Sequence, residues 1–535
     1  MNLSMRSLSR NLPRSPKLFP VLSCALAMAW VVNVLRQRPG FNPLTATLAD
    51  VSRLLDEGSL TSVDLVNAYI GQVEKHNKNG ARLNAVLSLV PEQTVLESAR
   101  KSDQERAAGK PRSRLHGIPF LVKDNLWTDK SFGLPVTCGA LAFKNTFAKQ
   151  NAYIIQTLLD AGMILLGTAN LSELANAKST QVWGGWSTLG GQTQSPYVDG
   201  GIDPTDTPLG HSCPAGSSSG SAVAVAAGMA PIAVGTECDG SIMMPADRAS
   251  IFSIRLSPTP TLTSGLLRYN SLGDSVGWMV KGAEDAALML NVALGNDDYT
   301  KYLGQSFKGL RIGLLDPMKW QPGTAIVRPN DEYNEQFMSE FNAMASKLES
   351  AGAIIHRDID LRRWTGEDQD MWRALTYHDY GHGFVEFTDG LIDPTVRTMS
   401  DLIDFNKKHA EQAMPPDNPG QDILEKTVAN MNSLSTEQYE EYQSTILNHT
   451  RDIGVDAAMK RYDIDVIMGA PTGRSATIYD AGGYPVGTLP LGYAKFNGRA
   501  FGLSFVVPRG REDLQVRVMS AWEKLLNPRK PPPKL

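Results

Sequence analysis

The chain has 535 residues, 42% of them hydrophobic and 20% charged, which is typical of a globular protein and ample for a buried core. Its formal net charge of −4 gives no electrostatic support for a nucleic-acid partner. The cysteines are too few for a disulfide framework at this length and none has metal-ligand spacing; they are Cys24, Cys138, Cys213 and Cys238. We expect neither a metal nor another cofactor.

The first 40 residues form a segment of their own. Basic residues precede an apolar run, Leu18–Leu35, which is the order found in secretory signal peptides, and Ala25–Ala27 offers small residues for cleavage. The run is about long enough to span a bilayer, so an uncleaved membrane anchor is the alternative. The Arg- and Ser-rich, acid-free start also fits a mitochondrial presequence. We predict the secretory route, giving a secreted or membrane-anchored protein, with a folded domain over residues 41–526 and a flexible tail over 527–535.

Two helices are predicted between Thr45 and Asn77, and a strand over Ile118–Val122 follows them. Lys123 comes directly after this strand, at its carboxyl end, where α/β sheets bind ligands. A lysine that leaves a core strand is partly desolvated, which lowers its pKa and makes a neutral amine available as a general base. The alternative is a surface lysine paired with Asp124.

The middle of the chain alternates between helical and strand patterns. We predict a helix over Asn151–Gly162, a strand over Met163–Gly167 and another helix that opens at Asn170 or Ser172. Such alternation favours an α/β fold with a central mixed, largely parallel twisted sheet covered by helices on both faces.

Two loops rich in small residues flank one helix and one strand. Gly216–Ser221 precedes an Ala-rich helix over Gly220–Met229, and a buried strand over Ile232–Thr236 leads to the second loop, which contains Ser241. The helix spans roughly 15 Å and the strand roughly 16 Å, so both loops meet at one end if the strand runs back along the helix. Serines beside converging backbone N–H groups would supply a nucleophile and an oxyanion site. A flexible linker is disfavoured by the flanking apolar segments, and a phosphate loop by the lack of a following Gly-Lys-Ser/Thr.

The second half contains a mostly helical region at about residues 320–460, including a long helix over Asp331–Gly352. His378 and His382 stand four residues apart there, as a zinc pair could. No Glu follows the first His as in the protease motif, so we prefer a structural role. Late strands are predicted over Asp463–Gly469 and Phe501–Val507, and a closing helix over Leu514–Leu526.

Three motifs together resemble the amidase signature family of serine hydrolases: Gly117–Asn125, Gly216–Ser221 and Gly235–Ile242. The resemblance covers about Leu44 to Leu526 and is strongest to the peptide amidase branch, which removes the amide from peptide C-termini. It implies the amidase signature fold and cleavage of a carboxamide, on a peptide or a small molecule, through an acyl-enzyme.

The resemblance also implies a Ser–cisSer–Lys triad. Lys123 matches the general base, Ser217 the bridging serine beside a non-proline cis peptide bond, and Ser241 the nucleophile. The backbone N–H groups that match the oxyanion hole are those of Cys238, Asp239, Gly240 and Ser241.

Two segments depart from the family pattern, Met243–Ser250 and Ser253–Pro258. They motivate an alternative function, a non-hydrolytic or acyl-transferring biosynthetic tailoring enzyme on the same scaffold. A different serine enzyme, with Ser218 in a Gly-x-Ser-x-Gly elbow, would need an apolar strand just before the loop and a late His; the sequence offers neither convincingly.

Overall fold

The computed structural model describes residues 41–526 and 529–535, so the predicted signal or anchor segment lies outside the described residues. Pro43–Leu535 form one compact unit. In the described ranges, no helix is long and apolar enough to cross a bilayer.

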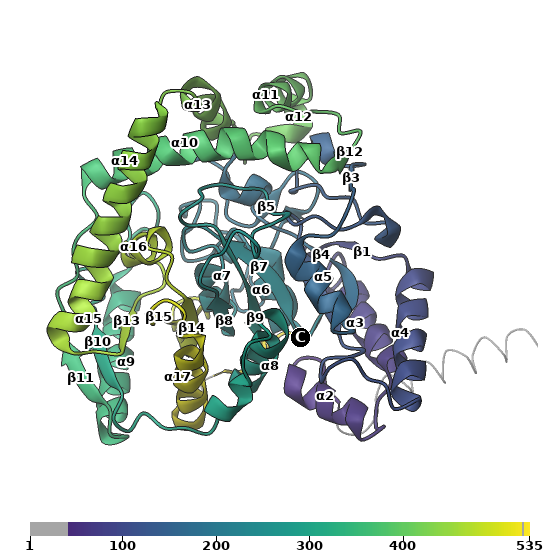
Figure 1. Cartoon of the computed structure of the whole chain (residues 1–535), viewed down its shortest axis with the longest axis horizontal. Coiled ribbons are helices and arrows are strands. Elements are labelled where there is room, and N and C mark those ends of the chain that lie inside the picture. The colour runs from purple at the N-terminus through teal and green to yellow at the C-terminus, as the bar shows by residue number, and fades with distance from the viewer. Residues whose placement is uncertain (1–40, 527–528) are drawn as a thin grey trace, which may run out of the picture. The chain divides into compact units, whose positions relative to one another are not determined.

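The described residues form an 11-stranded sheet that runs through the middle of this unit (Figure 1). In spatial order its strands are β1 (Val86–Leu89), β4 (Ile164–Ala169), β2 (Pro119–Lys123), β7 (Ala233–Glu237), β9 (Ser275–Val280), β8 (Phe252–Arg255), β14 (Val486–Tyr493), β15 (Ala500–Val506), β13 (Val466–Gly469), β10 (Arg311–Leu314) and β11 (Ile354–Arg357).

The sheet is mixed, as predicted. Parallel pairing joins β4, β2 and β7 on one side and β13, β10 and β11 on the other. The strands between these two blocks pair antiparallel, as does the edge strand β1 with β4. Every residue of β2, β4 and β7 is buried, which is the pattern of strands covered on both faces.

Helices cover both faces of the sheet (Figure 1). On one face α6 (Ser219–Ala226) packs against α7 (Met243–Arg248), and on the other α8 (Ala283–Ala293) packs between α5 (Tyr153–Asp160) and α17 (Glu512–Leu525). α6 is wholly buried and built from Ser, Gly, Ala and Val. A Cβ at Gly220 would lie 2.3 Å from Ala85 O and 2.4 Å from Asn170 O, so only glycine lets the helix start this close to the neighbouring backbone.

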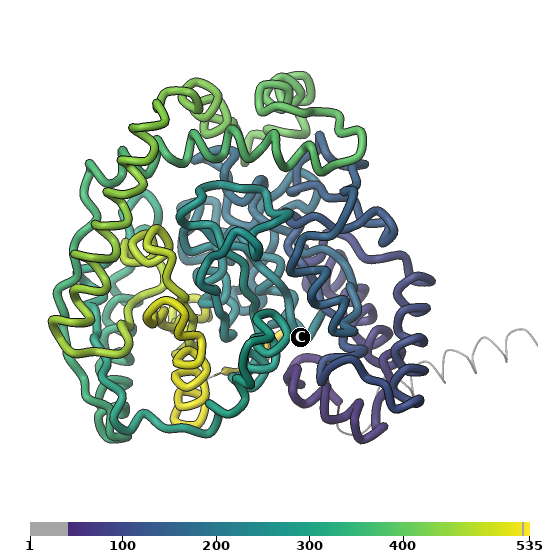
Figure 2. Tube along the Cα trace, in the orientation of Figure 1, coloured from purple at the N-terminus to yellow at the C-terminus, as the bar shows by residue number. Residues whose placement is uncertain are grey.

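Residues 320–460 are mostly helical in the structure. The α-helices of this region are α9 (Asp331–Ser350), α10 (Gly366–Asp389), α11 (Met399–Lys408), α12 (Ala410–Ala413), α13 (Asp422–Asn430), α14 (Thr436–Leu447) and α15 (Asp456–Tyr462). Tyr380 and Phe384 of α10 share an apolar cluster with Val136 and Leu174 from the loops after β2 and β4. The Cα trace shows these distant segments side by side (Figure 2).

The remaining elements lie around this framework. The α-helices are α2 (Leu48–Asp56), α3 (Ser62–His76), α4 (Glu92–Ala107) and α16 (Ser475–Ala481). The minor strands are β3 (Phe147–Ala148), β5 (Trp186–Ser187), β6 (Gly191–Gln192) and β12 (Leu391–Ile392). The 3-10 and π turns are η1 (Lys130–Phe132), η2 (Leu141–Phe143), η3 (Glu173–Asn176), η4 (Tyr299–Tyr302) and η5 (Asn448–Val455).

The helix expected after Asn170 was a wrong prediction. Only η3 forms there, and Leu174, Ala175 and Asn176 have φ values of 53°, 58° and 72°. Glu173 and Lys178 bracket this left-handed turn with a buried ion pair of 2.8 Å. Tertiary contacts therefore override the local helix-capping signal.

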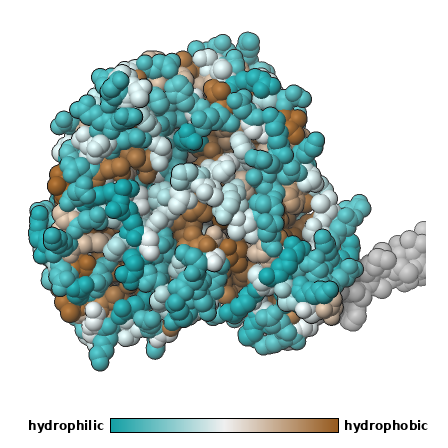
Figure 3. Space-filling view, viewed as in Figure 1, coloured by the Kyte–Doolittle hydropathy of each residue, from teal (hydrophilic) through white to brown (hydrophobic). Residues whose placement is uncertain are grey.

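The surface of the view in Figure 3 is mostly hydrophilic, with apolar residues scattered among polar ones. Exposed large apolar side chains come from separate elements, such as Tyr153 on α5, Ile354 on β11 and Leu525 on α17. Single exposed apolar residues of this kind do not mark a docking site. In the predicted tail, Lys530 is held at its backbone, because its carbonyl accepts the Tyr197 hydroxyl at 2.8 Å and its N–H donates to Tyr493 Oη at 2.7 Å.

Candidate active site

Lys123 ends β2 inside the molecule, with no exposed surface. Its Nζ lies 2.7 Å from Ser217 Oγ, 2.9 Å from Thr236 Oγ1 and 3.1 Å from Thr236 O. Burial lowers the pKa of Lys123 to about 7, so a large fraction of the side chain is a neutral amine at neutral pH. The alternative of a surface lysine paired with Asp124 is wrong, since that carboxylate instead accepts the Thr137 hydroxyl.

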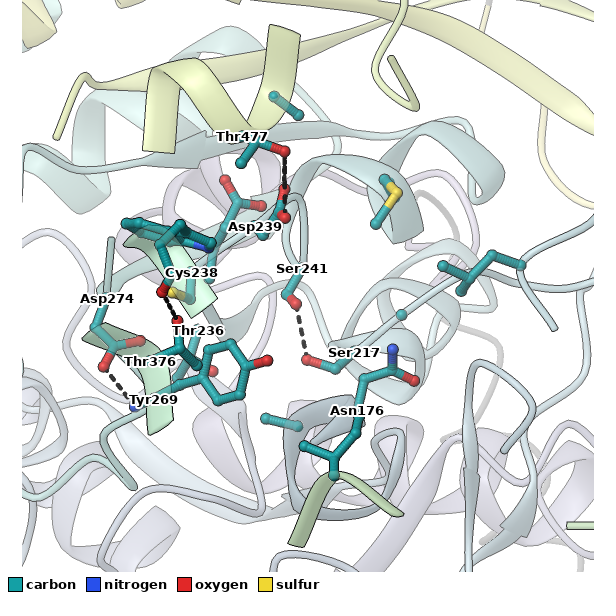
Figure 4. A pocket seen from close by; sticks show the side chains of 18 of the residues that line it. Asn176, Ser217, Thr236, Cys238, Asp239, Ser241, Tyr269, Asp274, Thr376 and Thr477 are labelled. Carbon is teal, nitrogen blue, oxygen red and sulfur yellow. Dashed lines mark hydrogen bonds between the residues drawn. The ribbon is translucent and has the colours of Figure 1, made fainter. Parts of the chain in front are cut away.

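The two serine loops meet as predicted from the lengths of the helix and the strand. The hydroxyl oxygens of Ser217 and Ser241 are hydrogen-bonded at 2.9 Å, and the N–H of Ser218 donates to Ser241 O at 3.0 Å (Figure 4). The peptide bond between Gly216 and Ser217 is cis. Ser217 is fully buried, whereas Ser241 is partly exposed to a cavity. The structure thus brings Lys123, Ser217 and Ser241 into one continuous hydrogen-bonded chain.

The segment from 238 to 242, called the Ser241 loop below, joins β7 to α7. The N–H of Gly240 donates to Asp480 Oδ2 at 2.8 Å, so it already has an acceptor and differs from the expected free oxyanion donor. The N–H groups of Asp239 and Ser241 have no acceptor among the described residues. The Asp239 side chain is exposed to the cavity and accepts the Thr477 hydroxyl at 3.1 Å (Figure 4).

The cavity in front of Ser241 has a volume of about 560 Å³. Its walls come from the Ser241 loop, the left-handed turn after Glu173, α10, α13 and the segment leading into α16. Polar and aromatic groups of the wall include Asn176, Tyr269, Trp372, Tyr377 and Thr477, and cationic ones include Arg373, Lys426 and Arg474.

Sequence reasoning missed most of these wall residues, because they come from segments with no shared motif. Asn176 lies in the segment after β4, where the sequence predicted a helix and the structure has the left-handed turn. Asp480, which has no exposed surface, was missed as well. The one feature of the sequence that could have pointed to Asp480 is that it is the only charged residue in the segment Ser475–Ala481.

The elbow alternative with Ser218 as nucleophile is wrong. Ser218 is fully buried, and its Oγ donates to the carbonyl of Thr236 at 3.1 Å. It therefore helps to fasten the start of α6 to β7 and does not face the cavity.

The other candidate sites raised by the sequence lie elsewhere. The ring centroids of His378 and His382 lie 4.7 Å apart, and the ring of His378 also contacts that of Tyr439 at a tilted angle. In the part of the chain that the structure describes, no cluster of three His, Cys, Asp or Glu side chains could hold a metal. Cys138, Cys213 and Cys238 are buried and unpaired.

The chain is similar to known proteins over nearly its whole described length. The sequence profile of the amidase family matches residues 64–477. A protein of Schizosaccharomyces pombe named as an amidase is 29% identical over 531 residues, covering 90% of this chain and 85% of that protein.

Solved structures agree with this match. The peptide amidase from Stenotrophomonas maltophilia is 29% identical with a TM-score of 0.79, over 91% of this chain and 98% of that one. An amidase family protein from Bacillus anthracis is 27% identical with a TM-score of 0.78, over 94% and 97%. The predicted fold class is confirmed.

Proposed function

Since the chain belongs to the amidase signature family and is an amide hydrolase, we propose that Ser241 is its nucleophile, Ser217 the bridging serine and Lys123 the general base. The observation that carries this proposal is the chain of hydrogen bonds Lys123–Ser217–Ser241, with heavy-atom distances of 2.7 and 2.9 Å.

The surroundings of Lys123 suit a neutral amine. A neutral amine has two N–H donors and one lone pair, and Nζ has three close oxygen neighbours. The carbonyl and the hydroxyl of Thr236 can accept the two N–H groups, which leaves the lone pair for the Ser217 hydroxyl. Because hydroxyl hydrogens rotate freely, Ser217 can then donate to Lys123 and accept from Ser241.

The proposed reaction follows from this polarity. Lys123 takes the proton of Ser217 as Ser217 takes that of Ser241, and the Ser241 oxygen attacks the amide carbonyl. The same relay returns a proton to the departing amine or ammonia, and water then cleaves the acyl-enzyme. We assign the binding of the oxyanion to the backbone N–H groups of Asp239 and Ser241, with the backbone N–H of Cys238 next to them. The N–H of Gly240 is left out because it already donates to Asp480.

The substrate is proposed to be a small amide, either a short peptide amide or another small-molecule amide. A cavity of about 560 Å³ falls within the size range of small-molecule sites. The similar structure from Stenotrophomonas maltophilia is named as a peptide amidase, which supports testing peptide amides first.

The test compares the wild type with Ser241→Ala on peptide, aryl and fatty amides. We expect Ser241→Ala to remain folded, to lose turnover and to lose covalent labelling by a fluorophosphonate, whereas Ser218→Ala should still be labelled. Retained turnover in folded Ser241→Ala would refute the assignment. Hydroxylamine added to the wild type distinguishes hydrolysis from acyl transfer, since a transferring enzyme would form the hydroxamate at the expense of the acid.

The segments that motivated a non-hydrolytic alternative form α7 and β8. Most of their residues are buried, and Met244, which is partly exposed, is the one of them that lines the cavity. The departures from the family pattern are therefore mostly changes in packing, and Met244 is the position where they would alter substrate choice.

The secretory route for the first 40 residues remains a proposal. It is tested by fusing residues 1–40 to a reporter enzyme. Export of the cleaved reporter supports it, and a cytoplasmic or mitochondrial reporter refutes it.

A further inference from the structure

Helix α16 holds the Ser241 loop through two hydrogen bonds. Asp480 of this helix accepts the N–H of Gly240 at 2.8 Å, and Thr477 donates to the carboxylate of Asp239 at 3.1 Å. Positions three apart on a helix share one face, so α16 contacts two consecutive residues of the loop with one face. The second contact is drawn in Figure 4, where Thr477 lies beside Asp239.

Asp480 belongs to a buried group of three ionisable side chains. Arg255 of β8 has its Nε 3.1 Å from Asp480 Oδ1 and 3.6 Å from Glu237 Oε1, and none of the three side chains is more than 2% exposed. Glu237 in turn accepts the N–H groups of the two residues that follow Ser241. Arg255 thus contacts both of the acidic side chains that bind backbone N–H groups of the loop.

The remaining N–H groups of the loop are left for the cavity. Gly240 has a φ of 75°, its N–H points to Asp480 of α16, and a Cβ at this position would lie 2.9 Å from Met244 Cε. The N–H groups of Asp239 and Ser241 on either side have no acceptor in the described part of the chain. They are the donors on which the proposed oxyanion site depends.

The same helix is also part of the cavity wall. Arg474, Ala476 and Thr477 line the cavity, together with residues 471–473 just before them. A ligand against this wall therefore touches the element that orients the loop.

We propose that α16 is the positioning element of the Ser241 loop and that Asp480 is its positioning residue, which holds the Gly240 peptide so that the neighbouring N–H groups face the acyl oxygen. This proposal rests on the proposed function, because it assigns those N–H groups to the oxyanion. Asp480 itself touches no reacting atom and acts through Gly240.

The experiment measures kcat and KM for a hydrolysed amide in Asp480→Ala, Asp480→Asn and a matched control. Loss of a well-placed oxyanion donor typically costs about 10²-fold or more in kcat, so we expect a loss of about 10²-fold in Asp480→Ala with KM changed less than about 3-fold. Asp480→Asn should recover part of kcat, because its amide oxygen can still accept the N–H of Gly240.

The control is Asp285→Ala. Asp285 is also fully buried and accepts backbone N–H groups, those of Ala49, Lys281 and Gly282, but it caps α8 away from the cavity. We expect a lower free energy of unfolding in this variant and an unchanged kcat. If Asp480→Ala fails to fold, Asp480→Asn takes its place, and we expect a smaller loss that is confined to kcat.

Three results would overturn the proposal. They are a folded Asp480→Ala with wild-type kcat, a rise in KM alone, or equal losses of kcat in Asp285→Ala. Ser241→Ala is assayed in parallel, since activity in that variant refutes the proposed function, whereas an inactive Ser241→Ala beside a fully active Asp480→Ala refutes only the role of Asp480.

Discussion

Replacing Lys123 by methionine should abolish activity and change how the stability of the protein depends on pH. Burial lowers the pKa of Lys123 from 10.5 to about 7, which corresponds to about 5 kcal/mol of preference for the neutral form in the folded state. At pH 7 about half of the side chain is then a neutral base, against roughly one in three thousand for an ordinary lysine. We therefore expect kcat/KM of the wild type to rise with pH through an apparent pKa near 7.

The sign of the stability effect follows from proton counting. Between about pH 7 and pH 10.5 the unfolded chain carries a proton on Lys123 that the folded protein has lost, so the free energy of unfolding rises with pH in this window. The slope from this one group approaches about 1.4 kcal/mol per pH unit. In Lys123→Met this contribution is absent. The free energy of unfolding of the wild type minus that of Lys123→Met should therefore rise by about 3 kcal/mol between about pH 7 and pH 9.5.

Urea unfolding followed by tryptophan fluorescence, repeated from about pH 6.5 to pH 9.5, measures this difference. Comparing slopes removes the pH-independent loss of the hydrogen bonds that methionine cannot make. Lys281→Met is the matched control, because Lys281 is also buried with a pKa of about 7 but donates to the carbonyls of Pro43 and Ala46, away from the cavity. It should flatten the stability profile and leave the pH dependence of kcat/KM unchanged.

Parallel stability profiles for the wild type and Lys123→Met would refute the lowered pKa. A kcat/KM that keeps rising to about pH 10 in the wild type would refute it independently, because the base would then titrate as an ordinary lysine.

Two further substitutions test the support of the site. Thr236→Val keeps the side-chain shape but removes the hydroxyl that accepts from Lys123 at 2.9 Å. We expect kcat to fall about 5- to 10-fold and the apparent pKa of kcat/KM to become lower, because the lost acceptor stabilises the ammonium form of Lys123 most. An unchanged pH profile of kcat/KM would contradict this. Lys178→Met leaves Glu173 as an unpaired buried charge behind the left-handed turn and should cost about 3–5 kcal/mol in urea unfolding. The double variant Glu173→Gln, Lys178→Met should lose less, and an equal or larger loss would show that the ion pair is not what the turn depends on.

The local sequence determined much of this protein. Apolar runs and glycine-rich loops placed β2, β4, β7 and α6 within a few residues of their observed bounds, since burial and helix propensity act over short segments. The lengths of the predicted helix and strand were enough to predict that Ser217 lies near Ser241. The position of Lys123 at the end of a core strand predicted that its side chain is desolvated.

Only the tertiary structure decided what surrounds those residues. Asp480 reaches Gly240 across 240 positions, and α10 adds Trp372 to the cavity from a region whose sequence carries no matching motif. The turn after Glu173 is left-handed because a buried ion pair and the packing of Leu174 outweigh its local preference for a helix. Local pattern specifies which segments are buried, but the direction of a single N–H or carboxylate depends on partners that folding brings from elsewhere in the chain.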